Sequence, residues 1–347
     1  MRAASIGSAH TLPPEHVHFE AADFDQTVPG HVMRLPLKDG RVLVCHMNTE
    51  TAERLRLDHV ASPLSRPALR YHGGKWRLAK WIIGNFPEHV CYVEPFGGAF
   101  SVGFRKKPST HEVWNDIDGD LLIFWTVLRE RTAELVRAIE LTPFSRAELS
   151  RAFGPTDGIE DLERARRLVV KAGQCRGSIR NKSGWRFEVT VPPAGRNIDR
   201  WNTAEHLWAV AARMKNVQIE SDDALCVIRR YDSEQTLFYV DPPYVTATRG
   251  ARWENACMGE MDDRQHGALA DQLHRVNGHV IVSGYPSPLY DRLYSGWRVE
   301  SRKAQTQAKT EATECLWISP PAEERRKLWR DKRAYGQLEM SIAEAAG

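Results

Sequence analysis

A short segment that could bind an amine, Asp241-Pro242-Pro243-Tyr244, follows the apolar run at 237–240. Proline fixes φ and has no backbone N–H, so the two prolines stiffen the segment and leave the Asp241 carboxylate and the Pro242 carbonyl as fixed acceptors. Two acceptors beside an aromatic ring suit a planar group that carries an amine, because the acceptors bind the amine hydrogens and Tyr244 stacks on the ring. A Pro-Pro turn with an aspartate cap is also common in ordinary loops, but such a turn does not require an aromatic residue directly after it.

Two further turns after apolar runs carry residue types that suit a nucleotide-like ligand. Gly97-Gly98 ends the segment YVEPFGG and precedes AFSVGF, which we expect to be helical. Glycine in such a turn lets the backbone approach a ligand and aims the helix N-terminus at it, although many turns contain glycine for other reasons. Asp116 ends the next run, EVWND, about 20 residues on, where a carboxylate can accept ribose hydroxyls. The alternative, that Asp116 caps the helix beginning at Gly119, is less favoured because Asp116 lies at the end of a strand.

Short apolar strands alternate with helices from Val90 onward. The expected strands are CYVEPF, EVWND, VQIES, TLFYVDPPY, HVIVSGY and ECLWIS. The expected helices include GDLLIFWTVLRE, ALCVIRRY and DRQHGALADQLHRV. This alternation predicts an α/β fold with a doubly wound, mostly parallel sheet. Ligands bind such a sheet beyond the carboxyl ends of its strands, where Asp116 and Asp241 are expected.

The pattern divides the chain into four parts. We expect an N-terminal extension, a core in two pieces, a domain inserted between them and a basic tail, at 1–67, 68–128 with 217–320, 129–216 and 321–347. The extension contains a hairpin, HVMRLPLKDGRVLVCHMN, that turns at Asp39-Gly40, and a helical stretch, TAERLRLDHV. The inserted domain contains the helical stretches LTPFSRAELSRAF and IEDLERARRLVVKAG. We interpret the tail, with RRKLWRDKR, as a solvated helix.

Positive charge is concentrated in the inserted domain. The net charge of the chain is only +3, which does not by itself indicate a nucleic-acid partner. Between Lys171 and Arg200, however, seven basic residues stand against two acids, a local excess of five. A solvated surface loop and a nucleic-acid contact both account for such a run.

Several other classes of protein and site are not indicated. The six cysteines are scattered without a C-x-x-C pair, so we expect neither a zinc site nor disulfides, and we interpret them as core residues. No apolar run approaches the roughly 20 residues that span a bilayer, and the N-terminus lacks a signal-peptide stretch, so a cytoplasmic location is expected. Gly73-Gly74-Lys75 lacks the spacing of a phosphate-binding P-loop.

Four segments in order, LRYHGGKWRLA, YVEPFGGAFSV, VWNDIDGDLL and FYVDPPY, resemble the DNA adenine methylase (Dam-like, phage-type) family. The resemblance covers 68–320, and only the DPPY segment is specific by itself. It implies a Rossmann-like fold that binds S-adenosylmethionine as cofactor. It also implies methyl transfer to the N6 amine of a flipped adenine in double-stranded DNA, without a metal and without a membrane.

The resemblance also assigns roles to residues. It implies catalysis by Asp241, Pro242, Pro243 and Tyr244. It implies cofactor contacts by Tyr71, Lys75, Glu94, Pro95, Phe96, Gly97, Asp116 and Asp241. The family motif K-W-A-G-G-K has Trp-Ala where this chain has Tyr71-His72, which keeps an aromatic residue but changes its neighbour.

With DNA as the partner, the basic segment becomes the expected DNA contact, because cations bind phosphates and polar side chains read base edges. The expected DNA-binding residues are Arg176, Ser178, Arg180, Asn181, Lys182, Trp185, Arg186 and Arg249. The chain could act as a monomer or as a homodimer on a palindromic site, associated with the nucleoid through DNA. The alternatives are methylation of N4-cytosine, RNA or protein glutamine, and a catalytically silent DNA-binding module.

Overall fold

The computed structural model describes three N-terminal strands by their backbone and most of the chain from residue 64 onward. The described residues of this second part are 64, 66–71, 73–176, 184–190, 196–245, 260–305, 311–321, 323 and 324, with the backbone alone at 304, 305, 311 and 312. The chain forms two compact units, Met1–His59 and Val60–Gly347, which are described separately.

An antiparallel sheet forms in the first unit. Its strands, in spatial order, are β1 (Asp23–Asp25), β2 (His31–Pro36) and β3 (Val42–Met47). The pairing of β2 with β3 confirms the expected hairpin. Its turn at Asp39-Gly40 and the helical stretch expected at 51–60 lie outside the described residues.

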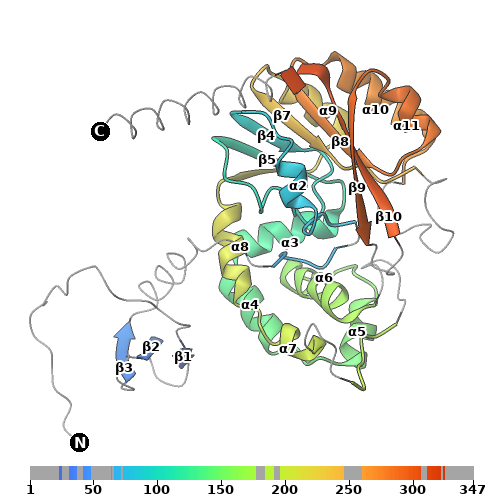
Figure 1. Ribbon diagram of the computed structural model, residues 1–347. Coiled ribbons are helices and arrows are strands. Elements are labelled where there is room, and N and C mark those ends of the chain that lie inside the picture. The colour runs from blue at the N-terminus through green and yellow to red at the C-terminus, as the bar shows by residue number, and fades with distance from the viewer. Residues whose placement is uncertain are drawn as a thin grey trace, which may run out of the picture. The chain divides into compact units, whose positions relative to one another are not determined.

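A seven-stranded sheet organises the second unit in the order β6-β5-β4-β7-β8-β10-β9 (Figure 1). Its strands are β4 (Cys91–Glu94), β5 (His111–Asn115), β6 (Val217–Glu220), β7 (Thr236–Val240), β8 (His279–Gly284), β9 (Arg298–Gln305) and β10 (Glu311–Ile318). Along the spatial order from β6 through β5, β4 and β7 to β8, neighbouring strands pair in parallel. β10 is antiparallel to both β8 and β9. The expected doubly wound, mostly parallel sheet is therefore confirmed.

Helices surround this sheet and fill the stretch at 129–216 (Figure 1). They are α2 (Ala79–Ile83), α3 (Gly119–Glu130), α4 (Thr132–Glu140), α5 (Arg146–Ala152), α6 (Asp161–Gln174), α7 (Asn197–Trp201), α8 (His206–Met214), α9 (Ala224–Arg230), α10 (Asp263–Arg275) and α11 (Pro288–Leu293). The helices expected at GDLLIFWTVLRE, ALCVIRRY and DRQHGALADQLHRV correspond to α3, α9 and α10.

Alternate strand residues contribute to two separate cores. Val93 and Phe238 pack with residues of α9, α10 and α11, whereas Tyr92 and Tyr239 pack with residues of α2, α3 and α8. Side chains of a strand point to opposite faces in turn, so every residue of β7 and of β8 is buried. Burial on both faces is typical of parallel sheets covered by helices. It gives the residue after β7 a rigid support.

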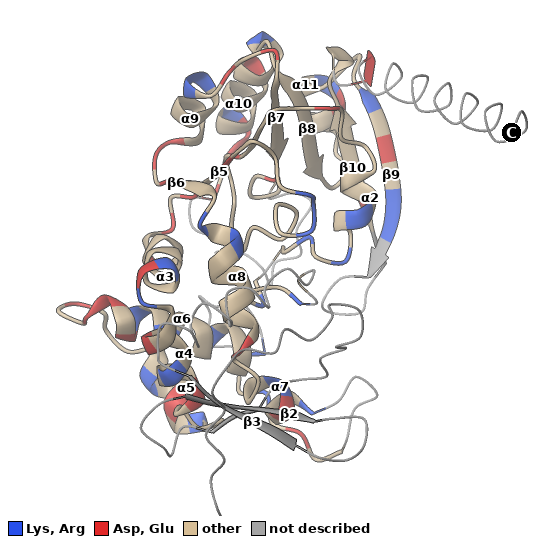
Figure 2. Ribbon diagram, turned by 90° about the vertical axis from the view of Figure 1, so that its left-hand side faces the viewer, with Lys and Arg blue, Asp and Glu red and all other residues tan. Residues whose placement is uncertain are grey.

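The sequence did not predict β9. This strand lies at the edge of the sheet, and its sequence, RVESRKAQ, is rich in charge, as the blue and red along its ribbon show (Figure 2). Edge strands often carry charged residues, which discourage pairing with other chains. The apolar run that revealed the central strands is therefore missing from β9.

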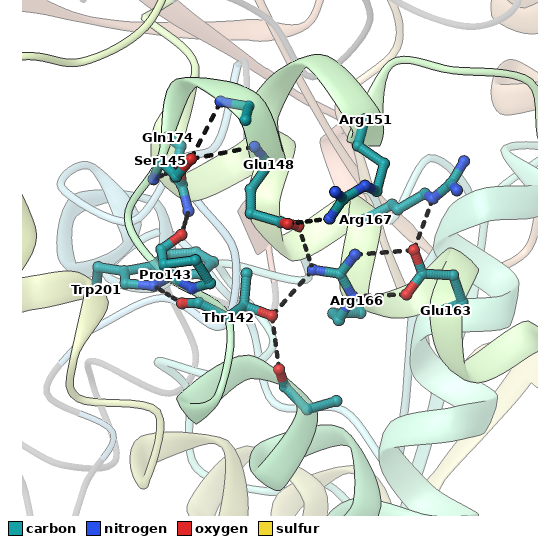
Figure 3. Close-up of polar contacts among 12 residues, drawn as sticks. Thr142, Pro143, Ser145, Glu148, Arg151, Glu163, Arg166, Arg167, Gln174 and Trp201 are labelled. Carbon is teal, nitrogen blue, oxygen red and sulfur yellow. Dashed lines mark hydrogen bonds and ion pairs between the residues drawn. The ribbon is translucent and has the colours of Figure 1, made fainter.

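The helices at 129–216 are joined by polar contacts (Figure 3). α6 packs on α3, α4 and α5. From α6, Arg166 forms ion pairs with Glu163 at 2.6 Å and with Glu148 of α5 at 3.1 Å, and it donates a hydrogen bond to Thr142. The hydrogen bond from Arg166 is the main reason that the pKa of Glu163 falls to about 2. The helices α4–α7 form a lobe that is thus held together by ionic contacts as well as by its apolar core.

One helix that we expected is not formed. The segment AFSVGF consists of turns, and Phe100 has a φ of 51°. A residue in the left-handed region cannot continue a right-handed α-helix. The turn at Gly97-Gly98 therefore does not aim a helix N-terminus at a ligand, and that expectation was wrong.

The four cysteines whose side chains the structure describes, Cys91, Cys175, Cys226 and Cys315, are free thiols. Cys175 and Cys315 are buried, as expected for core residues, whereas Cys91 and Cys226 are only half-buried. Among the described residues, no helix is both long enough and apolar enough to span a bilayer.

Candidate active site

The carboxyl ends of β4 and β7 meet where the order of the sheet reverses. From β4 the chain continues to β5 and β6 on one side, while β7 and β8 lie on the other. In doubly wound sheets the crevice at such a switch point is where ligands bind. Glu94 ends β4 and Asp241 follows β7, so two residues expected in the site lie at neighbouring strand ends.

Asp241 has a partner on each carboxylate oxygen. Ser283 of β8 donates to Oδ1 at 2.7 Å, and Nζ of Lys75 lies 2.9 Å from Oδ2. The hydroxyl of Ser283 lies 3.0 Å from that of Tyr239, and both of these side chains are buried. A connected set of buried hydrogen bonds of this kind fixes the orientation of the carboxylate.

The Lys75 ammonium is buried among oxygen atoms. It donates to the Gly73 carbonyl at 2.8 Å and lies 3.7 Å from Oε1 of Glu314. Burial alone would lower the pKa of Lys75, but the carboxylates of Asp241 and Glu314 outweigh it and hold the pKa above its ordinary value. Lys75 is therefore a cation at neutral pH, and it compensates charge on the two acids.

Tyr244 lies beside this ammonium. Nζ of Lys75 is 4.8 Å from the centroid of the Tyr244 ring, within cation–π range. The ring of Tyr285 meets it edge to face, with centroids 4.7 Å apart. The Tyr244 hydroxyl donates a hydrogen bond to Oε1 of Glu314. The aromatic residue expected to stack on a planar ligand is thus held at its face, its edge and its hydroxyl.

Glu94 is bonded within the protein interior. Its Oε1 accepts from the Tyr92 hydroxyl at 2.7 Å and from the Gly103 N–H at 2.8 Å. Burial raises the pKa of Glu94 to about 8, despite these two hydrogen bonds. At pH 7 this carboxyl is mainly protonated. Its expected contact with a cofactor stays a prediction.

The turn after β4 is tied to the end of β5. Asn115 donates from its side chain to the Pro95 carbonyl at 2.9 Å, and the Gly97 N–H donates to the Asn115 carbonyl at 2.7 Å. A Cβ at Gly97 would lie 2.3 Å from the Trp114 indole, so only glycine fits this approach. Phe96 is half-buried and packs against the core of α9, α10 and α11.

Asp116 joins the same turn from the other side. Its Oδ2 accepts from the Gly98 N–H at 2.9 Å, and its Oδ1 accepts from the Asp118 N–H at 2.9 Å. The cap of α3 is Asp118, so the alternative role of Asp116 as the helix cap is wrong. A Cβ at Gly98 would lie 3.1 Å from the ring of Tyr71, which shows how closely the ring approaches the turn. An aromatic ring, a glycine turn and a half-buried carboxylate form a residue set that fits a nucleoside ligand.

The basic segment is described only in part. Arg176 donates to the Phe187 carbonyl at 3.2 Å, and Arg186 donates to the Cys175 carbonyl at 2.6 Å. No carboxylate of the described residues lies within ion-pair distance of either guanidinium. Burial, followed by the nearby charge of Arg70, lowers the pKa of Arg186 to about 10.

Other residues of the expected DNA contact are less well placed or fall outside the description. The Trp185 ring is half-buried and packs against Phe144 with centroids 5.3 Å apart. Five expected residues lie outside the described part of the chain, namely Ser178, Arg180, Asn181, Lys182 and Arg249.

Sequence reasoning missed several polar residues that surround Asp241. Ser283 and Tyr285 lie in the segment SGY at the end of β8, a position that the strand-end rule could have revealed. Glu314 is the acid within the apolar run TECLWIS, and it is only 4% exposed. A charged residue is rarely buried unless it is paired, so an acid in an apolar strand was the available signal.

Comparisons with known proteins agree with this geometry. Residues 71–308 match the family described as D12 class N6 adenine-specific DNA methyltransferase. DNA adenine methylase of Escherichia coli K12 is 26% identical over 244 residues, which cover 66% of this chain and 84% of that protein. DNA adenine methylase of Serratia marcescens is 24% identical over 236 residues, which cover 65% of this chain and 85% of that protein.

These matches decide between the enzyme classes considered from the sequence. Adenine N6 in DNA is the position methylated, so the reaction needs a methyl donor and a DNA substrate. No cluster of three or more side chains able to bind a metal occurs among the described residues. The chain belongs to the D12 class of N6 adenine-specific DNA methyltransferases.

Proposed function

We propose that Asp241 and the Pro242 carbonyl bind the two hydrogens of the adenine N6 amine, with Tyr244 stacked on the base. The observation that supports this assignment is the position of Asp241. It lies at the switch point of the sheet, directly after a fully buried strand, with its Oδ1 fixed by Ser283. A carboxylate held in this way presents a preorganised acceptor, which lowers the reorganisation that the reaction requires.

The chemical problem is that the adenine amine is conjugated with its ring and is a poor nucleophile. Two acceptors that bind both hydrogens favour localisation of the nitrogen lone pair, which then points away from them. Asp241 can afterwards take the proton that the amine loses. No covalent enzyme intermediate is needed.

We propose S-adenosylmethionine as the methyl donor. When bound, it supplies an electrophilic methyl group on its sulfonium sulfur. Asp116 would bind its ribose, while Tyr71 and the turn of Glu94, Pro95, Phe96 and Gly97 would form the adjoining wall. The fit rests on the glycine turn, the aromatic ring and the half-buried carboxylate described above.

We further propose that the target base is flipped out of the duplex, since a stacked base cannot reach a crevice at a strand end. The stretch at 129–216 would carry target recognition, with Arg176 and Arg186 bound to phosphates. Binding to DNA would keep the protein at the nucleoid. On a palindromic target, a monomer would act twice, whereas a homodimer would act once.

Expression of the chain in cells that lack adenine methylation tests the proposal. We expect N6-methyladenine at one recurrent sequence when the genome is sequenced by a method sensitive to this base. The Asp241→Ala variant should leave the genome unmodified. N6-methyladenine produced by that variant at the wild-type level would refute the role of Asp241, and purified protein that binds no S-adenosylmethionine by calorimetry would refute the methyl donor.

A further inference from the structure

Glu314 of β10 contacts two residues of the active site, yet the mechanism above does not use it. It accepts a hydrogen bond from the Tyr244 hydroxyl, and its Oε1 lies 3.7 Å from Nζ of Lys75. Its side chain is only 6% exposed. A buried carboxylate is costly unless its contacts compensate it, so this position calls for an explanation.

The explanation begins with a conflict at Asp241. Each carboxylate oxygen can accept more than one hydrogen bond, but the Lys75 ammonium lies at Oδ2 and also over the Tyr244 ring, where the proposed mechanism places the target base. Ser283 donates to the other oxygen, Oδ1. Ser283 is fully buried and its hydroxyl is bonded to Tyr239, so it is poorly placed to move. Lys75 has a long, flexible side chain and is the partner that can leave.

The Lys75 ammonium has the contacts that the target base is proposed to make. It lies 2.9 Å from Oδ2 of Asp241 and 4.8 Å from the centroid of the Tyr244 ring. The amine and the ammonium would therefore compete for the same acceptor. A buried cation that left Asp241 without another anion nearby would be strongly destabilised. Glu314 is that second anion, and it already lies close to Nζ.

We propose that Glu314 is a positioning residue for base capture, which receives the Lys75 ammonium when the target amine takes its place on Asp241 and holds Tyr244 by its hydroxyl. This inference rests on the proposed function of Asp241. In the free protein, Lys75 satisfies Asp241. When adenine enters, Lys75 moves toward Glu314, and Tyr244 keeps its position because its hydroxyl stays bonded to the same carboxylate.

The first test compares two variants of Glu314 in single-turnover methylation of unmethylated plasmid DNA. Glu314→Gln keeps the size and an acceptor for Tyr244 but removes the charge, so the rate should fall about 10- to 100-fold. Glu314→Asp keeps the charge and should be closer to wild type. Thr313→Val is the matched control, because Thr313 is the exposed neighbour on the same strand and its side chain points to the other face. It should methylate at the wild-type rate.

A double-mutant cycle then separates positioning from a general structural effect. Tyr244→Phe removes only the hydroxyl that Glu314 accepts, and Glu314→Ala removes the acceptor as well as the charge, so combining these two changes should cost much less than the product of the two single effects. If Glu314→Ala does not fold, as judged by its thermal transition, the cycle is run with Glu314→Leu. Multiplicative effects would overturn the proposal. So would a Gln variant within about twofold of wild type, or equal rates for Gln and Asp.

The outcomes also distinguish this proposal from the proposed function. If the wild-type protein fails to form N6-methyladenine in the same assay, the function itself is wrong. If the wild type methylates while Glu314→Gln does so equally fast, only the role of Glu314 is wrong.

Discussion

Ion pairs occur both at the carboxyl end of the sheet and in the lobe of α4–α7, but they differ in kind. At the sheet, one buried lysine, Lys75, lies between the half-buried Asp241 and the buried Glu314. In the lobe, Arg166 and its neighbours form many pairs along and between helices (Figure 3). At the sheet, one cation for two acids leaves negative charge available for a ligand. Around Arg166, three arginines pair with two glutamates, so no negative charge is left over. We therefore expect substitutions at the sheet to affect activity and substitutions in the lobe to affect stability.

The largest effect should come from Asp241→Ala. This variant removes the acceptor for the target amine and the partner of Lys75, so methyl transfer should fall by at least about 1,000-fold. Asp222→Ala is the matched control, because Asp222 is an exposed aspartate after β6 at the same edge of the sheet, where it pairs with Arg230. Incorporation of labelled methyl groups into DNA measures both. Equal losses would mean that Asp241 has no special role and that the comparison fails.

Charge reversal across the basic segment should have the next largest effect. Reversal of Arg176, Arg180, Lys182 and Arg186 should weaken DNA binding by about 100-fold or more at moderate salt and flatten its salt dependence by about 0.9 in slope for each lost phosphate contact. Fluorescence anisotropy of labelled DNA across a salt series measures this slope.

The control for this reversal is Arg196→Glu. Arg196 is exposed, as Arg176 is, but it is already paired with Asp199 at 2.6 Å. Its reversal should change the slope little. An unchanged slope in the variant with all four charges reversed would mean that DNA binds elsewhere. It would also mean that arginines bonded to carbonyls contribute no more to DNA binding than an arginine paired with a carboxylate.

The sequence could predict which residues lie at the strand ends but not all of the contacts that they make there. Central strands such as β7 are continuous apolar runs, and a residue that follows such a run must lie at the strand end, so Asp241 and Asp116 could be located from sequence. The contacts of Lys75 with Asp241 and Glu314 could not, because these three residues are far apart in the sequence and the order of the strands in the sheet is set by tertiary packing. The failed helix at AFSVGF has a local cause, the left-handed Phe100, that apolar periodicity does not reveal.

In the lobe, Arg166→Ala should lower the free energy of unfolding by about 1–3 kcal/mol without affecting the methyl-transfer step. The Arg166 side chain is only 11% exposed and pairs with Glu163 and Glu148, which would keep only their other arginine partners. Arg196→Ala is the control, because both partners of that pair are more than half exposed and should contribute less than about 1 kcal/mol. Urea denaturation measures both. A larger loss for Arg196→Ala would contradict the idea that burial determines the strength of these pairs.

Glu94, a further carboxyl group at the sheet end, should make the stability of the protein depend on pH. Glu94 has a pKa raised by burial to about 8, above its ordinary value of 4.5, so the folded protein binds a proton there that the unfolded chain releases above pH 4.5. The contribution of Glu94 to stability should therefore be fully present below about pH 4.5 and should decrease by up to about 1.4 kcal/mol per pH unit as pH rises toward 8.

Glu94→Gln tests this dependence, because it mimics the protonated carboxyl and keeps an acceptor for Tyr92 and Gly103. Its stability should fall less steeply than that of the wild type between pH 5 and 8, as measured by urea denaturation at each pH. Parallel stability curves for wild type and Glu94→Gln would mean that Glu94 is ionised in the fold. The sheet end would then hold three carboxylates, those of Glu94, Asp241 and Glu314, near the one ammonium of Lys75. The shortage of cations that distinguishes it from the helical lobe would be greater still.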